Sequence, residues 1–164
     1  YSYTKRCTAL CHMVLGVGLA LAPIGAYIAV TGHFALVPVL YSVAVLLWSS
    51  GFDIIYALQD EGFDKEEKLH SIPAALGTKN ALSLSVALHV GSALCIIATA
   101  FLVPFTWVYY IGIAFFCMML IYQHLLVKPN DLSKVDRAFM TTNGYASVVF
   151  ALCFLLDAFI RTNF

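Results

Sequence analysis

Three long stretches of this sequence carry no charged side chain, and they constrain the fold more than any other feature. Residues 7–52, 80–127 and 138–156 contain no Asp, Glu, Lys or Arg. A helix needs roughly 20 apolar residues to cross a bilayer. The two longer stretches can therefore each hold two spans, and the third can hold one. Because a backbone inside a bilayer must satisfy its own hydrogen bonds, each span is predicted to be a helix.

Turn-forming residues divide both longer stretches near their middles, at VTGHF (30–34) and LVPFTW (102–107). The chain is 62% hydrophobic and 11% charged, with a mean hydropathy of +0.88, whereas a soluble domain is about 25% charged. We therefore predict an all-α, polytopic membrane helical bundle, with residues 1–164 forming one domain. Its transmembrane helices are predicted at about 9–30, 36–58, 81–103, 107–127 and 138–160.

The basic residues fall almost entirely on one side of such a bundle. Eight of the nine Lys and Arg residues precede the first helix or lie in the second-to-third and fourth-to-fifth connections, and only Arg161 lies on the other side. Positive charge collects on the cytoplasmic face of membranes. We therefore expect an integral protein of a bacterial inner (plasma) membrane with these loops in the cytoplasm. Nothing beyond these loops offers the basic surface that nucleic-acid binding requires.

Isolated polar residues within the apolar stretches are predicted to serve packing. His89 and His124 are expected to be satisfied packing residues, and Asn143 to hydrogen-bond across helices. Asp157 is expected to reach the membrane interface opposite the basic loops. The first helix also has small residues that predict close packing against a neighbour: Gly16, Gly18, Ala22 and Gly25.

Three aspartates at the end of the second helix are the main candidates for chemistry. Asp53, Asp60 and Asp64 are separated by steps of seven and four residues, which return to nearly the same helix face at about 100° per residue. Tyr56 shares that face. Acidic groups in a span usually face a cavity or partner, and neighbouring carboxylates repel unless a cation lies between them. Carboxylate oxygens suit Mg²⁺, which commonly bridges to phosphates.

The spacing alone leaves a plainer interpretation open. The aspartates can be solvated groups at a helix end, with Lys65 and Lys68 as their ion-pair partners. Gly62 weakens a helix, so Asp64 is predicted to lie on a loop.

The sequence DIIYALQDEGFDKEEKLHSIPAALG, residues 53–77, contains D-x-x-Y-A-x-Q-D-x-x-x-D, then L-H-S-I-P and Gly77. This pattern resembles the second aspartate-rich motif of the UbiA superfamily of intramembrane aromatic prenyltransferases, in its 4-hydroxybenzoate polyprenyltransferase-like branch. YSYTKRCT at the N-terminus and LLVKPNDLSKVDRAFMTTNGYASVVF at 125–150 resemble other parts of the same family. The likeness thus covers essentially the whole chain. One departure is Lys68, which stands where the family usually has glycine.

The resemblance implies a place within a larger fold. The family has a nine-helix bundle and a first motif of the N-x-x-x-D-x-x-x-D kind, which this sequence does not contain. We therefore expect the chain to be the C-terminal portion of a prenyltransferase membrane domain, with the N-terminal half supplied by another segment. For the chain as it stands, a non-catalytic membrane helical module is the alternative.

The resemblance also implies a reaction and its residues. The full-length protein would transfer a polyprenyl group from polyprenyl diphosphate to an aromatic acceptor such as 4-hydroxybenzoate in quinone biosynthesis, with Mg²⁺ as cofactor. Asp60 and Asp64 would hold the metal and diphosphate, and Asp53 would act through water or as a base near the aromatic ring. All three are assigned as catalytic. The residues implied in substrate binding are Lys5, Arg6, Tyr56, Lys68, His70 and Ser71.

Two other classes of membrane protein fit less well. CDP-alcohol phosphotransferases need D-x-x-D-G followed by A-R, which DEGFD at 60–64 does not supply. A transporter predicts helix-breaking residues together with charges at mid-membrane. Pro23 and Gly25 give the first of these features but not the second.

Overall fold

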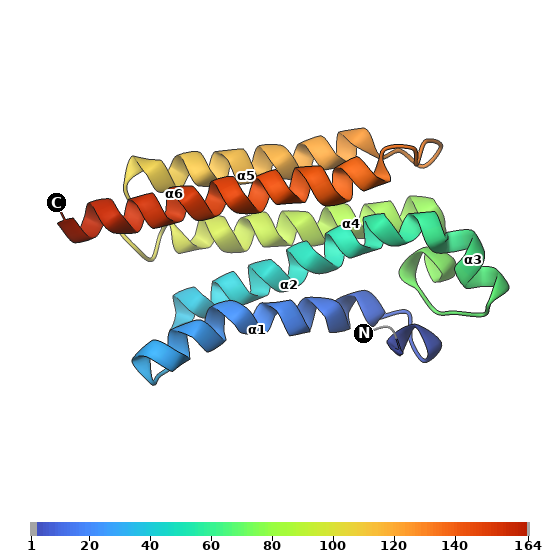
Figure 1. Ribbon diagram of the computed structural model, residues 1–164, viewed down its shortest axis with the longest axis horizontal. Helices are drawn as coiled ribbons and strands as arrows, with labels where there is room; N and C mark the ends of the chain where they lie inside the picture. Colours follow the sequence, from blue (N-terminus) through green and yellow to red (C-terminus); the bar gives the residue numbers. More distant parts are fainter. Residues whose placement is uncertain (1–2, 164) are drawn as a thin grey trace.

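The computed structural model of the protein describes residues 3–163, a range that is helical and contains no strand. Tyr1 and Ser2 of the YSYTKRCT segment lie outside the described residues. The elements, in chain order, are η1 (Thr4–Arg6), α1 (Cys11–Thr31), α2 (Leu36–Ala57), η2 (Leu58–Asp60), α3 (Glu61–Glu66), α4 (Ile72–Thr99), α5 (Trp107–Leu126), η3 (Arg137–Thr142) and α6 (Asn143–Asn163). Figure 1 shows the long helices running up and down along one axis.

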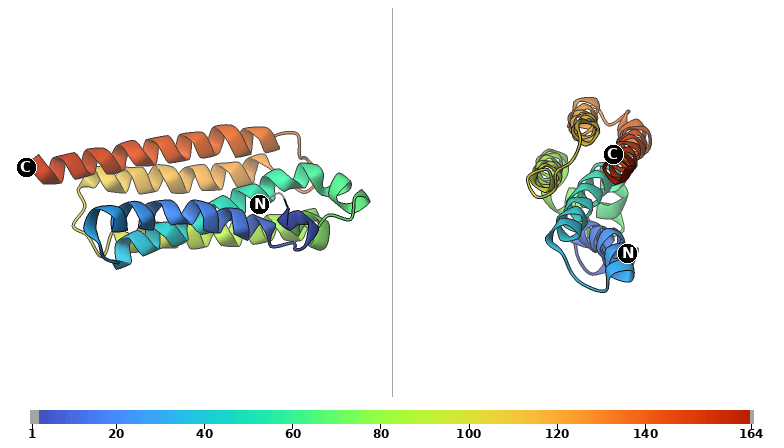
Figure 2. Two further views of the ribbon diagram at one scale, coloured as in Figure 1. Left: turned by 60° about the horizontal axis from the view of Figure 1, so that its bottom comes forward. Right: turned by 90° about the vertical axis from the view of Figure 1, so that its left-hand side faces the viewer.

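Within residues 3–163, five helical segments are long and apolar enough to cross a membrane, as the sequence predicted. α2 packs against α1 and α4, while α5 packs against α6. Figure 2 shows α2 and α4 in the middle of the bundle, with α1 on one side and α5 and α6 on the other. Residues 3–10, 58–71 and 127–136 gather at one end, which we call the loop end (Figure 1). The predicted basic loops therefore share one end of the bundle.

The third transmembrane helix begins earlier than predicted, at Ile72 instead of 81, and ends at Thr99. Its start is set by the hydroxyl of Ser71, which accepts a hydrogen bond from the Ala74 N–H at 3.3 Å, and by a proline in the first turn. Gly77 interrupts the helix with φ 75° and ψ 161°. The residues before Gly77 are therefore a short leading segment, and this kink explains the difference from the predicted boundary.

Two apolar clusters form the core. One joins the end of α2 to the start of α4 and to the 127–138 segment, and includes Ile54, Ile55, Leu58, Ile72 and Val135. The other fills the space between α2, α4, α5 and α6 and includes Tyr109, Phe116 and Leu120. The first cluster lies directly beneath the loop end, so it holds α2 and η2, which carry Asp53 and Asp60.

The small residues of α1 behave as predicted at one position only. A Cβ on Gly16 would meet Leu46 O at 2.7 Å and would collide with Ser50 Oγ, so α1 and α2 approach closely there. Gly18 and Gly25 have open space in the Cβ direction among the described residues, and Ala22 is exposed. Of the four small residues, only Gly16 therefore packs closely against α2.

The buried polar residues make helix–helix contacts. His89 lies 2.8 Å from His124, with Nδ1 facing Nε2, and Trp48 Nε1–H donates to Asn143 Oδ1 at 3.2 Å; both contacts confirm the packing roles predicted. Asp157 is buried and accepts from Thr106 N–H at 2.6 Å. Arg161 Nε donates to the same carboxylate at 2.7 Å. Asp157 thus joins α6 to the start of α5, at the end of the bundle opposite the basic loops.

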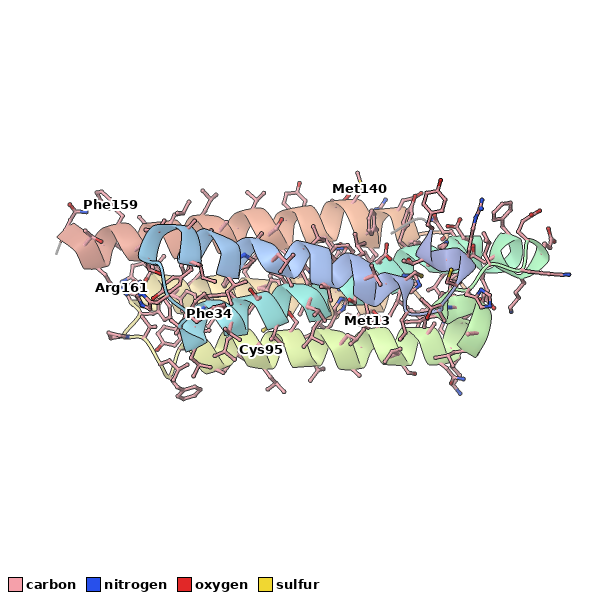
Figure 3. The ribbon with its side chains drawn as sticks, turned by 90° about the horizontal axis from the view of Figure 1, so that it is seen from below. Met13, Phe34, Cys95, Met140, Phe159 and Arg161 are labelled. Atoms are coloured by element: carbon pink, nitrogen blue, oxygen red, sulfur yellow. The ribbon has the colours of Figure 1, made fainter. Side chains whose placement is uncertain are left out.

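The faces of α6 that turn away from the bundle are apolar. Figure 3 shows Met140 and Phe159 pointing outward along this segment, and Arg161 toward the end away from the loop end. Met140 and Phe159 are both mostly exposed. Large exposed apolar side chains on long helices fit contact with lipid or with further apolar helices.

Candidate functional site

Two of the predicted aspartates converge on one lysine at the loop end. Lys5, on η1, places its Nζ 3.2 and 3.1 Å from the two carboxylate oxygens of Asp64. The same Nζ lies 3.7 Å from Asp60 Oδ2. The side chain of Asp64 is 1% exposed and that of Asp60 is 51% exposed. The site therefore has one buried and one open carboxylate around a single cationic atom.

The chain reaches this arrangement through a change of helix type. After Ala57, α2 gives way to the tighter η2, and α3 then begins at Glu61. The run from Leu36 to Glu66 is thus one helical span with a 3₁₀ turn in it. As the spacing predicted, all three aspartates turn toward the same neighbouring segment, residues 5–12. Gly62 does not end the helix: Asp64 lies within α3 instead of on a loop. The tighter turn lets Asp60 and Asp64 meet Lys5, while Asp53 stays inside the bundle.

Asp53 has a separate partner that sequence reasoning missed. Its Oδ2 lies 2.6 Å from Nδ1 of His12 on α1, and both residues are buried. His12 also lies beneath the start of α4, because the Ile72 N–H points to its Nε2 at 3.4 Å. The available signal was a histidine at the start of an uncharged stretch, seven residues after Lys5.

The segment from Lys68 to Ser71 closes the site from the α4 side. The His70 N–H donates to Lys5 O at 2.6 Å, which ties this segment to η1. The His70 side chain is exposed, whereas Ser71 is fully buried as the cap of α4. Lys68 is exposed and adopts φ 54°, the left-handed region. This conformation favours glycine, which accounts for the glycine usual at this position in the family that the sequence resembles.

The remaining predicted substrate residues lie around the same end. Tyr56 is 39% exposed and its ring lies 4.4 Å from that of Phe139. The guanidinium of Arg6 lies 5.7 Å from the centre of the Tyr3 ring. Lys65, proposed above as a partner of the aspartates, instead pairs with Glu61 at 2.6 Å. Within residues 3–163, Lys68 makes no ion pair with an acidic side chain at the distances that define the other pairs.

A complete metal site is not formed by the described residues. No group of three or more His, Cys, Asp or Glu side chains comes together there in a way that could hold a metal ion. Asp60 and Asp64 nevertheless share one cation position, now taken by the Lys5 ammonium. Mg²⁺ is often held by one or two carboxylates, with waters and phosphates as further ligands. The pair therefore fits part of a Mg²⁺ site.

The sequence also matches a known family along most of its length. The UbiA prenyltransferase family matches residues 1–155. The chain belongs to this family. Two relatives called 4-hydroxybenzoate octaprenyltransferase are 28% identical over 151 residues (Tolumonas auensis) and 26% identical over 161 residues (Nitrosospira multiformis). A solved structure of a UbiA homolog from Aeropyrum pernix K1, in its apo form, superimposes with a TM-score of 0.82 at 29% identity.

These UbiA relatives are longer than the chain. The match with the Tolumonas auensis relative covers 92% of the chain and 52% of that relative. The match with the Nitrosospira multiformis relative covers 98% of the chain and 55% of that relative. The match with the Aeropyrum protein covers 95% of the chain and 58% of that protein's chain. The chain thus spans about half the length of the curated relatives it matches. Its five-helix bundle is a UbiA fold over that length.

Proposed function

We propose that the full-length protein containing these helices transfers a polyprenyl group from polyprenyl diphosphate to an aromatic acceptor such as 4-hydroxybenzoate, in quinone biosynthesis. Membership of the UbiA family and the names of the relatives support a prenyltransferase. The observation that carries the proposal in the structure is the convergence of Asp60 and Asp64 on one cation position beside Lys5. A diphosphate is an anion, so a bound cation would neutralise its charge and a lysine would donate hydrogen bonds to its oxygens.

The charges of this cluster suit a diphosphate held through a cation. Two carboxylates around one ammonium leave an excess of one negative charge, which attracts a divalent ion. When bound, Mg²⁺ would neutralise charge on the departing diphosphate. Asp60 and Asp64 would hold the metal, and Lys5 would then donate hydrogen bonds to diphosphate oxygens. Arg6, Lys68 and His70 lie on the same segments and are proposed to contact the substrates, whereas Ser71, predicted as a further contact, is buried and caps α4.

The reaction exchanges one bond for another. The allylic C–O bond breaks and its electron pair leaves with the diphosphate, while a ring carbon of the phenol forms a C–C bond and then loses a proton. Asp53 is proposed to take part as a base near the ring or through water, and Tyr56 to line the acceptor side. A site that excludes water protects the reactive allylic cation. The buried apolar cluster beneath the aspartates serves this purpose.

We propose that the loop end faces the cytoplasm of a bacterial cell and that the bundle lies in the plasma membrane. The reason is the clustering of basic residues there. The polyprenyl chain would then remain in the bilayer while its diphosphate reaches the loop end. The other half of the site is proposed to come from the segments that the longer relatives have in addition.

The direct test is prenyl transfer by the full-length protein in membranes, with labelled polyprenyl diphosphate, 4-hydroxybenzoate and Mg²⁺. Asp60→Asn and Asp64→Asn should each lower turnover at least about 100-fold, because each removes a charge that would hold the metal–diphosphate unit. Asp131→Asn is the matched control, since Asp131 is an exposed carboxylate in the 127–136 loop. Near-normal turnover by Asp60→Asn would refute the assignment.

A further inference from the structure

His12 lies where three elements of the candidate site meet. It belongs to the first turn of α1, it contacts Asp53 on α2, and it contacts the first residue of α4. Its side chain is fully buried. The two nitrogens of its ring face two different partners, at 2.6 Å and 3.4 Å. A buried ring with both nitrogens engaged has one allowed orientation.

These partners also determine which nitrogen carries the proton. The Ile72 backbone N–H can only donate, so His12 Nε2 must accept. Asp53 Oδ2 accepts, so Nδ1 must donate to it. With its proton on Nδ1, the ring bridges the Asp53 carboxylate and the Ile72 backbone amide. A second ring proton, on Nε2, would face the Ile72 N–H directly.

The contacts around His12 extend to the lysine of the site. The segment that ends at Ile72 also carries His70, whose N–H donates to Lys5 O at 2.6 Å. The Cys11 thiol lies 3.7 Å from His70 O and is fully buried. The residue beside His12 is thus packed against the same segment that holds the backbone of Lys5.

We propose that His12 is a positioning residue for the prenyl-transfer site. Its Nδ1–H orients the Asp53 carboxylate, and its Nε2 holds the start of α4 so that the 68–72 segment stays docked on η1. The kinetic part of this inference rests on the proposed function. The geometric part does not, since it concerns only how the 68–72 segment is held.

The kinetic test compares two substitutions in the full-length protein. His12→Met keeps similar volume but removes both hydrogen-bonding atoms, so prenyl transfer should fall about 10- to 100-fold, as expected for losing a hydrogen bond to a charged group. His12→Gln keeps one donor and one acceptor and should stay within about threefold of the parent. His33→Leu, at an exposed position in the connection between α1 and α2, is the control and should have no effect. Equal losses in His12→Met and His12→Gln would overturn the proposal.

A double substitution separates positioning of Asp53 from a general loss of structure. If His12 acts through Asp53, His12→Met should add less than about threefold to the loss caused by Asp53→Leu alone. A full additional 10- to 100-fold loss in the double variant would overturn the part of the proposal in which His12 orients Asp53, while the docking of the 68–72 segment has its own test below.

The second readout needs no enzymatic activity. Cys11 should be slow to react with a membrane-permeant maleimide in the parent and in His12→Gln, and fast in His12→Met, because the 68–72 segment no longer covers it. The measurement uses a background with alanine at the other cysteines, namely Cys7, Cys95, Cys117 and Cys153. Equal protection in the parent and His12→Met would overturn the docking role. If the parent transfers no prenyl group, the proposed function fails, whereas this labelling result still decides the role of His12.

Discussion

The contact between Lys5 and Asp64 should be the strongest ion pair at the loop end. Both oxygens of Asp64 lie within 3.2 Å of Lys5 Nζ, and the exposed fractions of the two side chains are 18% and 1%. The pair Lys65–Glu61 is shorter, at 2.6 Å, but its side chains are 52% and 18% exposed. Solvent screening weakens a pair more than a few tenths of an ångström strengthen it. Burial, and not the distance between the charged atoms, therefore decides which of the two ion pairs is stronger.

A double-mutant cycle measures this difference. Charged hydrogen bonds that are largely buried contribute about 1.5–3 kcal/mol, so Lys5→Met and Asp64→Asn should show a coupling free energy in that range. Exposed i,i+4 pairs contribute about 0.3–0.5 kcal/mol, which is the value expected for Lys65→Met with Glu61→Gln. The assay is reversible chemical unfolding in mixed micelles, followed by helicity. If the first coupling energy does not exceed the second, the argument from burial is wrong.

Four further predictions concern backbone, packing, topology and activity. Lys68→Gly should raise the free energy of unfolding by about 1 kcal/mol, because φ 54° is strained for lysine, and chemical unfolding would show it. Gly51→Ala should lower the free energy of unfolding by about 1–3 kcal/mol in the same assay, since a Cβ there would collide with the His89 ring. Single cysteines placed at residues 33 and 66 should react from opposite sides of the membrane; labelling of both from one side would contradict the five-span arrangement. Membranes containing only residues 1–164 should hold an inserted bundle that makes no prenylated 4-hydroxybenzoate, since only two carboxylates converge in the described residues; Mg²⁺-dependent product would contradict this.

The long helices could be predicted from the sequence because their cause is local. An uncharged apolar stretch in a bilayer has to satisfy its backbone hydrogen bonds within itself, so length and composition suffice. The predicted 36–58 and 107–127 correspond closely to α2 and α5. The start of α4 was missed because Gly77 adopts a left-handed conformation within the helix. The same apolar pattern fits a straight or a kinked helix.

The candidate site was predictable in its residue types but not in its pairings. The spacing of Asp53, Asp60 and Asp64 indicated carboxylate chemistry, and periodicity placed all three on one face. In the structure all three turn toward the segment of residues 5–12, but they meet two different partners there: Asp53 contacts His12, and Asp60 and Asp64 contact Lys5. Both Lys5 and Asp64 are polar residues beside a span, and many other pairs in the sequence have the same character. Because Lys5 and Asp64 are 59 positions apart, no local pattern in the sequence predicts that they meet.

The sequence by itself determined that this chain is a helical membrane bundle with its basic loops at one end, because hydrophobic length and charge are properties of each segment alone. Tertiary structure decided which carboxylate each cation meets. Asp64 binds Lys5 because η1 folds back against α3 and the 68–72 segment, and Asp53 binds His12 because Gly16 lets α1 approach α2 closely. These contacts depend on how three helices pack, and packing is a property of the whole bundle, so no single segment of the sequence encodes them.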